Sequence, residues 1–117
     1  MAQQDLYIGL GSMAYALSKS DGCLQLEELR TLEQMLRNEQ HGEIALSVLD
    51  LKARYEESVE DAYQFAFRRF VENRRELDKD MKKKFHLILE HVAESYDGIS
   101  GKEDELLRRF RRDINRL

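Results

Sequence analysis

Apolar residues recur at three- and four-residue spacing along almost the whole chain, and this periodicity constrains the fold more than any other feature. Six stretches show it, and each is long enough for an amphipathic helix of several turns. Proline is absent and the six glycines are dispersed, so no segment resembles a flexible linker. A chain of 117 residues can bury one hydrophobic core but not two. We therefore expect an all-α fold, a single compact domain over residues 1–117 with six helices.

The predicted helices lie near residues 5–19, 25–38, 42–54, 58–75, 79–96 and 101–116. Two of them end at an Asp-Gly pair, Asp21-Gly22 and Asp97-Gly98, where glycine can adopt the left-handed conformation that closes a helix. Ser100 and Glu103 have the spacing of a capping box at the start of the last helix. Ser58 provides a similar start for the fourth helix.

Composition narrows the classes of function. The chain has 19 basic and 23 acidic residues, a net charge of −4; residues 1–58 hold 5 and 10 of them, and residues 59–117 hold 14 and 13. The acidic first half argues against nucleic-acid binding. The longest apolar run, Met13 to Leu17, is too short for a membrane span or a signal-peptide core, so we expect a soluble cytoplasmic protein. The single cysteine, Cys23, excludes an internal disulfide, and we interpret it as a small buried loop residue.

The two Asp-Gly corners resemble each other in sequence. Each follows a helix, continues with an aliphatic residue that we expect to be tucked in (Leu24 or Ile99), and reaches a glutamate in the first turn of the next helix. This similarity predicts an internal pseudo-repeat. Glu28 lies seven residues after Asp21, whereas Glu103 lies six after Asp97. Either the second loop is one residue shorter, or the counterpart of Glu28 is Asp104 or Glu105.

With these corners the sequence resembles the TerB-like family of tellurite-resistance-associated proteins, which is related to the N-terminal region of the membrane-anchored co-chaperone DjlA. Asp21, Gly22, Leu24 and Glu28 match the first copy of the family pattern, and Asp97, Gly98, Ile99 and Glu103 match the second. The resemblance therefore spans nearly the full chain. It implies a compact helical domain in which the two acidic corners approach each other.

The resemblance also implies a function, a non-enzymatic binding module in a stress-response or tellurite-resistance context. The metal ligands would be Asp21, Glu28, Asp97 and Glu103, holding a divalent cation such as Ca²⁺, which binds six to eight oxygens. Protein partners, and peripheral association with a membrane, are the interactions it suggests. No residue of the chain indicates tellurite chemistry.

A simpler interpretation makes the same carboxylates helix caps, each stabilising a helix N-terminus by about 0.3 to 1 kcal/mol. The chain is then a metal-free structural interaction domain, with a homodimer as one form. Neither corner is an EF-hand, because the first and third loop positions would be Leu17 and Lys19 in one corner and Ala93 and Ser95 in the other. Carboxylates at helix starts are therefore compatible both with a divalent-cation site and with helix caps alone.

The remaining polar residues carry weaker signals. His41, His86 and His91 lack zinc-site spacing, and we expect them at the surface or its boundary. Two basic stretches, residues 82–84 and 108–112, are interpreted as a solvated, partly paired face, with a phosphate-rich partner such as anionic lipid headgroups or RNA as the alternative. No nucleophile motif, glycine-rich phosphate loop or cofactor fingerprint occurs, which favours a protein that is not an enzyme.

Overall fold

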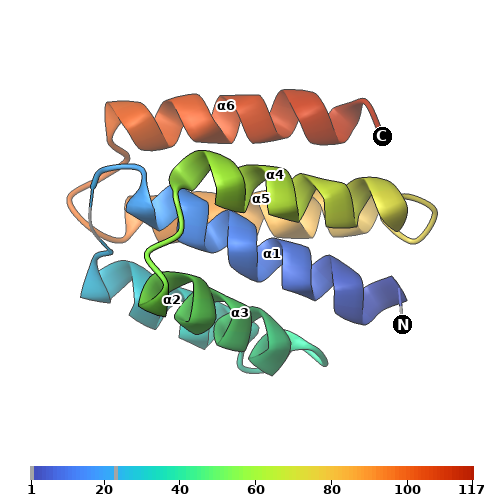
Figure 1. The fold of residues 1–117 in the computed structure, drawn as a ribbon, viewed down its shortest axis with the longest axis horizontal. Helices are drawn as coiled ribbons and strands as arrows, with labels where there is room; N and C mark the ends of the chain where they lie inside the picture. Colours follow the sequence, from blue (N-terminus) through green and yellow to red (C-terminus); the bar gives the residue numbers. More distant parts are fainter. Residues whose placement is uncertain (1, 23) are drawn as a thin grey trace.

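The computed structural model describes residues 2–22 and 24–117, and these residues form six α-helices joined by short loops (Figure 1). The helices are α1 (Ala2–Lys19), α2 (Leu26–Leu36), α3 (Gly42–Arg54), α4 (Val59–Glu72), α5 (Lys79–Glu94) and α6 (Gly101–Asn115). This confirms the all-α prediction, and every predicted end lies within three residues of the observed one. The radius of gyration, 12.6 Å, is that of one compact globule.

Helix α1 runs through the middle of the molecule, with α6 on one side and α2 and α3 on the other (Figure 1). Residues 9–18 are all buried, so this part of α1 is covered around its circumference. The exposed face expected for the first helix lies in its first two turns, where Gln3 is exposed and Gln4, Asp5 and Ile8 are partly exposed. Small residues on α1 let its neighbours come close: a Cβ at Gly11 would overlap the backbone carbonyl of Ala45 in α3. The buried hydroxyl of Ser12 is satisfied, since it donates to the carbonyl oxygen of Ala62 at 2.8 Å.

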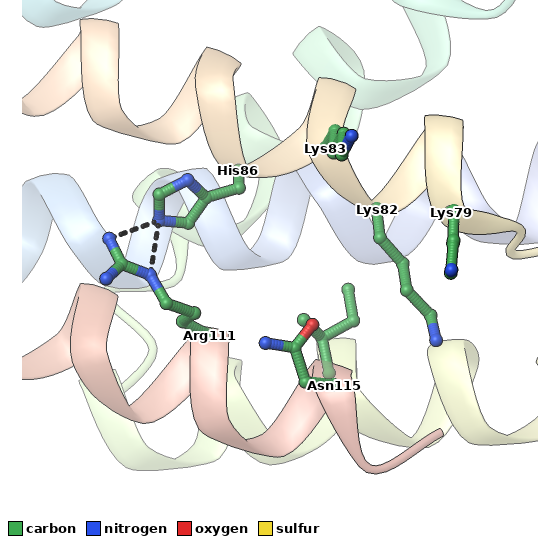
Figure 2. Close-up of a pocket in the computed structure, with 7 residues that line it drawn as sticks. Lys79, Lys82, Lys83, His86, Arg111 and Asn115 are labelled. Carbon is green, nitrogen blue, oxygen red and sulfur yellow. Dashed lines mark hydrogen bonds between the residues drawn. The ribbon is translucent and has the colours of Figure 1, made fainter.

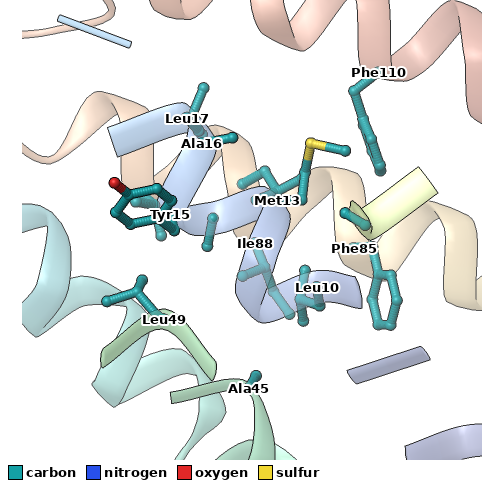
Figure 3. Close-up of a cluster of buried hydrophobic side chains, with 14 of the residues drawn as sticks. Leu10, Met13, Tyr15, Ala16, Leu17, Ala45, Leu49, Phe85, Ile88 and Phe110 are labelled. Atoms are coloured by element: carbon teal, nitrogen blue, oxygen red, sulfur yellow. The ribbon is translucent and has the colours of Figure 1, made fainter. Parts of the chain in front are cut away.

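The core joins α1, α3, α5 and α6 through aliphatic and aromatic side chains (Figure 3). Phe85 meets the ring of Tyr7 edge-on at a centroid distance of 5.3 Å, and Phe70 meets Phe110 in the same way at 6.1 Å. Burying each such side chain contributes about 1.5 to 3 kcal/mol. The first contact joins α5 to the central helix α1, and the second joins α6 to α4.

Several apolar residues expected on buried faces are exposed: Leu26, Leu51, Tyr55, Tyr96 and Ile99. Four of them stand at helix ends or in loops, where no neighbouring helix covers them. Ile99, which the sequence suggested was tucked in, is 37% exposed, whereas its counterpart Leu24 packs against the core.

Side-chain caps begin three of the helices. The Ser58 hydroxyl accepts from the Asp61 amide at 3.1 Å, and Asp78 accepts from the Met81 amide at 2.9 Å.

In the described part of the chain, none of the helices is both long and apolar enough to cross a membrane.

Candidate functional site

The two Asp-Gly corners close their helices in related but different ways. Gly22 and Gly98 have positive φ angles of 103° and 78°, as expected for helix-closing glycines. In the second corner Asp97 is also left-handed, with φ 53°. This difference agrees with the shorter separation between aspartate and glutamate in the second corner. The internal pseudo-repeat remains a prediction.

The corners are neighbours in space. The loop after α1 and the loop before α6 lie at the same end of the molecule (Figure 1). The hydroxyl of Ser100 donates to Asp21 Oδ1 at 2.6 Å, a contact between residues 79 positions apart. The N-termini of α2 and α6 are thereby placed side by side.

Glu28 and Glu103 each occupy the third position of their helix, and both side chains are buried, with 2% and 1% exposure. Glu103 completes the predicted capping box: its Oε1 accepts from the Ser100 amide at 3.1 Å, and its own amide donates to the Ser100 hydroxyl at 3.1 Å. Glu103 thus stands at the same helix position as Glu28, whereas only Glu103 belongs to a capping box. Among the described residues, Glu28 Oε1 and Glu103 Oε2 are buried without a hydrogen-bond partner.

The two carboxyl groups meet each other. Burial raises the pKa of Glu28 well above its ordinary value, and a hydrogen bond with Glu103 and the negative charges of Glu103, Asp21 and Glu27 raise it further. The raised pKa favours the protonated, uncharged form of Glu28 next to Glu103.

Of the four predicted ligands, the structure brings together Asp21, Glu28 and Glu103. Asp97 is exposed, and no hydrogen bond or ion pair among the described residues involves it. Within residues 2–22 and 24–117, no group of three or more acidic, histidine or cysteine side chains has the geometry of a formed metal site. The prediction for Cys23 falls outside the described residues.

The sequence interpretation missed a second feature, a cleft between α5 and α6 (Figure 2). Its volume is about 420 Å³, and its lining residues are Lys79, Lys82, Lys83, His86, Arg111, Ile114 and Asn115. The four α5 residues follow one another at helical spacing, so the sequence already contained a signal for a polar stripe. What it did not contain was the position of Arg111 opposite that stripe.

The histidines lie at the surface or its boundary, as predicted. His91 is exposed, and the ring of His41 lies 5.7 Å from the ring of Tyr7. His86 hydrogen-bonds with Arg111.

No protein-family model, no curated protein and no solved structure matches the chain. The resemblance to TerB-like proteins therefore depends on the corner residues quoted above. Function has to be argued from the groups at the site and their chemistry.

Proposed function

We propose that the chain is a non-enzymatic binding module, TerB-like in its paired corners, which binds a divalent cation through Glu28, Glu103 and Asp21. One observation carries the proposal: two buried carboxyl groups from different corners touch, and each keeps one oxygen without a partner. An unsatisfied buried polar group costs about 1 to 3 kcal/mol. A hard cation such as Ca²⁺, which prefers oxygen ligands, would satisfy both oxygens.

The contacts assign different roles to the three carboxyl groups. Glu103 is held in place, because its Oε1 and its amide are both engaged by Ser100. Glu28 contributes the oxygen that changes state, since it must release its proton before it can bind a cation. Asp21 is exposed and lies at the rim, where its charge draws a cation towards the buried pair. Cation binding should therefore strengthen as the pH rises.

Thermal unfolding tests this function. The protein is melted in EDTA and in millimolar Ca²⁺, Mg²⁺, Mn²⁺ or Zn²⁺, at about pH 6 and about pH 8. A cation at a hundredfold excess over its dissociation constant stabilises the fold by about 2.7 kcal/mol, which raises the melting temperature by several degrees in a domain of this size. We expect the larger shift at the higher pH.

Two variants separate the site from general charge effects. Glu28→Gln keeps the size of the side chain but removes a ligand, so the cation-dependent shift should disappear. Glu27→Gln is the matched control, because Glu27 is the exposed neighbour on the same helix turn and should keep the shift. Absence of a shift with every cation, or an equal shift in both variants, would overturn the proposal.

A second candidate function is a metal-free structural interaction domain, including a homodimer. The capping box favours it, because it stabilises the corner without a cation, and the raised pKa of Glu28 favours a pair without a second buried charge. Replacing Glu103 would then lower stability without changing any binding, and sedimentation at two protein concentrations would reveal a dimer. The stress-response and tellurite-resistance context comes from the resemblance alone.

A further inference from the structure

The cleft between α5 and α6 gathers positive charge in a small volume. Lys79, Lys82 and Lys83 come from the first two turns of α5, and Arg111 comes from the last turns of α6 (Figure 2). No aspartate or glutamate is among its lining residues. A protein with a net charge of −4 thus concentrates four cations at one place.

These four cations have no carboxylate partner, unlike seven other basic residues in the described part of the chain, which form ion pairs. Among the described residues, Lys79, Lys82, Lys83 and Arg111 form no ion pair with a carboxylate. The adjacent Lys84, in contrast, lies 2.9 Å from Glu39 Oε1. Like charges held together without counter-charges repel each other, and an anionic ligand would relieve that repulsion.

Arg111 is held in position by His86. The Nε and Nη2 atoms of Arg111 lie 3.3 and 3.1 Å from His86 Nε2 (Figure 2). The His86 ring stacks on Phe110 at a centroid distance of 6.4 Å. Burial and the charge of Arg111 lower the pKa of His86, so at neutral pH the unprotonated Nε2 accepts from the guanidinium. A guanidinium has five N–H donors, so Arg111 keeps others for a ligand.

We propose that this cleft binds a phosphate-monoester or diphosphate group, with Arg111 and Lys82 as its principal contacts. A guanidinium can bind phosphate oxygens in a bidentate manner, and lysines add point charges. Lys82 is half-buried and Ile114 is buried, so a bound phosphate would be partly shielded from water, where its ion pairs are stronger. The volume fits a headgroup or a small phosphorylated molecule.

The site lies at the opposite end of α5 and α6 from the acidic corners (Figure 1). It does not depend on the proposed cation function, and titrations in EDTA keep the two questions apart. Two sources could supply the phosphate: a soluble phosphorylated molecule or a phosphoinositide headgroup at a membrane surface.

The soluble arm is a calorimetric titration with pyrophosphate and with ATP at low salt in EDTA. The membrane arm is co-sedimentation with phosphatidylcholine vesicles that contain either phosphatidylinositol 4,5-bisphosphate or phosphatidylserine at equal charge. Binding to the soluble probes alone identifies a soluble phosphate ligand. Preference for the phosphoinositide over phosphatidylserine identifies a headgroup.

The variant Lys82→Gln/Arg111→Gln should lose affinity by about tenfold or more, because two charge-assisted contacts disappear. The control Arg30→Gln/Arg37→Gln changes the net charge equally at two exposed sites outside the cleft, one in α2 and one directly after it, and should change affinity by less than about twofold. Melting of each variant confirms that it folds. Absence of binding to every phosphate probe, binding to phosphatidylserine vesicles as strong as to phosphoinositide vesicles with no soluble binding, or equal losses in both variants would overturn the proposal.

Discussion

A cluster of like charge lies near each end of α5 and α6, and the two clusters behave differently. At the corner end Glu28 and Glu103 are buried, with exposures of 2% and 1%. At the other end the cations of the cleft lie at the surface, and Lys79, Lys83 and Arg111 are exposed. Composition alone would treat the acidic and the basic cluster as equivalent apart from the sign of their charge. The difference between them comes from burial.

In the buried pair, burial and the negative charge of Glu103 raise the pKa of Glu28, because two charges in a low-dielectric interior cost more than one. The cleft needs no such adjustment, since water and salt screen its charges. A buried charge cluster thus changes the pKa of its members and the free energy of unfolding. An exposed charge cluster mainly changes the affinity for ligands of opposite charge.

The largest expected effect comes from Glu103→Ala. It removes the capping box and leaves the Glu28 carboxyl buried without its partner, so we expect a loss of about 2 to 4 kcal/mol in the free energy of unfolding. Arg111→Ala, at the exposed end, should change stability by no more than about 0.5 kcal/mol. Urea denaturation measures both, and similar losses would contradict the contrast between the two ends.

The second prediction concerns pH. The pKa of Glu28 is raised in the folded chain, so folding binds a proton and the stability from this group is fully present below its unfolded pKa, about 4.3. That stability is lost as the pH rises towards the folded pKa. Glu28→Gln, which is neutral at every pH, should exceed the wild type by about 1 to 2 kcal/mol at pH 8 and by less at pH 5. Denaturation in EDTA at both pH values checks this, with Glu27→Gln as the control, and a constant difference would refute it.

The third prediction compares two neighbouring lysines. Lys82→Gln removes one of the clustered cations and should stabilise the protein by about 0.3 kcal/mol at low salt, a gain that high salt abolishes. Lys84→Gln breaks the pair with Glu39 and should destabilise it by about 0.5 kcal/mol. Denaturation curves at low and high salt measure the difference. A loss of stability in Lys82→Gln would indicate that its charge is already compensated.

The smallest effect is expected at Asp97, and it distinguishes the two corners. Asp97→Asn should change stability by less than about 0.3 kcal/mol, since asparagine also tolerates left-handed backbone and the carboxylate has no partner among the described residues. Asp21→Asn removes the negative charge that accepts from Ser100 and acts on Glu28, so it should lower the pKa of Glu28. NMR titration of the Glu28 carboxyl carbon detects that shift, and an equal shift in both variants would mean that the corners are equivalent.

Local signals in the sequence predicted most of the helices well. Ser58, Ser100 and the two Asp-Gly pairs mark their helix ends through hydrogen bonds and backbone preferences that act within a few residues. The same local rules described α1 only in part, because an apolar stripe was expected along the helix and residues 9–18 proved to be buried on every side. Small residues such as Gly11 allow that burial only because α3 lies against them.

The candidate site was predictable only in part. The sequence similarity of the two Asp-Gly corners singled out Asp21, Glu28, Asp97 and Glu103. A sequence pattern, however, does not tell which of these side chains points inwards. The backbone conformation of the second corner decides that Ser100, rather than Asp97, contacts the first corner. Likewise, the stripe of lysines on α5 is visible in the sequence, but a cleft exists only once α6 places Arg111 opposite it.

The sequence by itself determined the six helices, their caps and the two acidic turns, because these depend on hydrogen bonds and apolar periodicity within a few residues. Only the tertiary structure decided that Glu28 and Glu103 are buried together and that Arg111 faces the lysines of α5. Both depend on distances between residues far apart in the chain, and electrostatic energies follow those distances and the water between them.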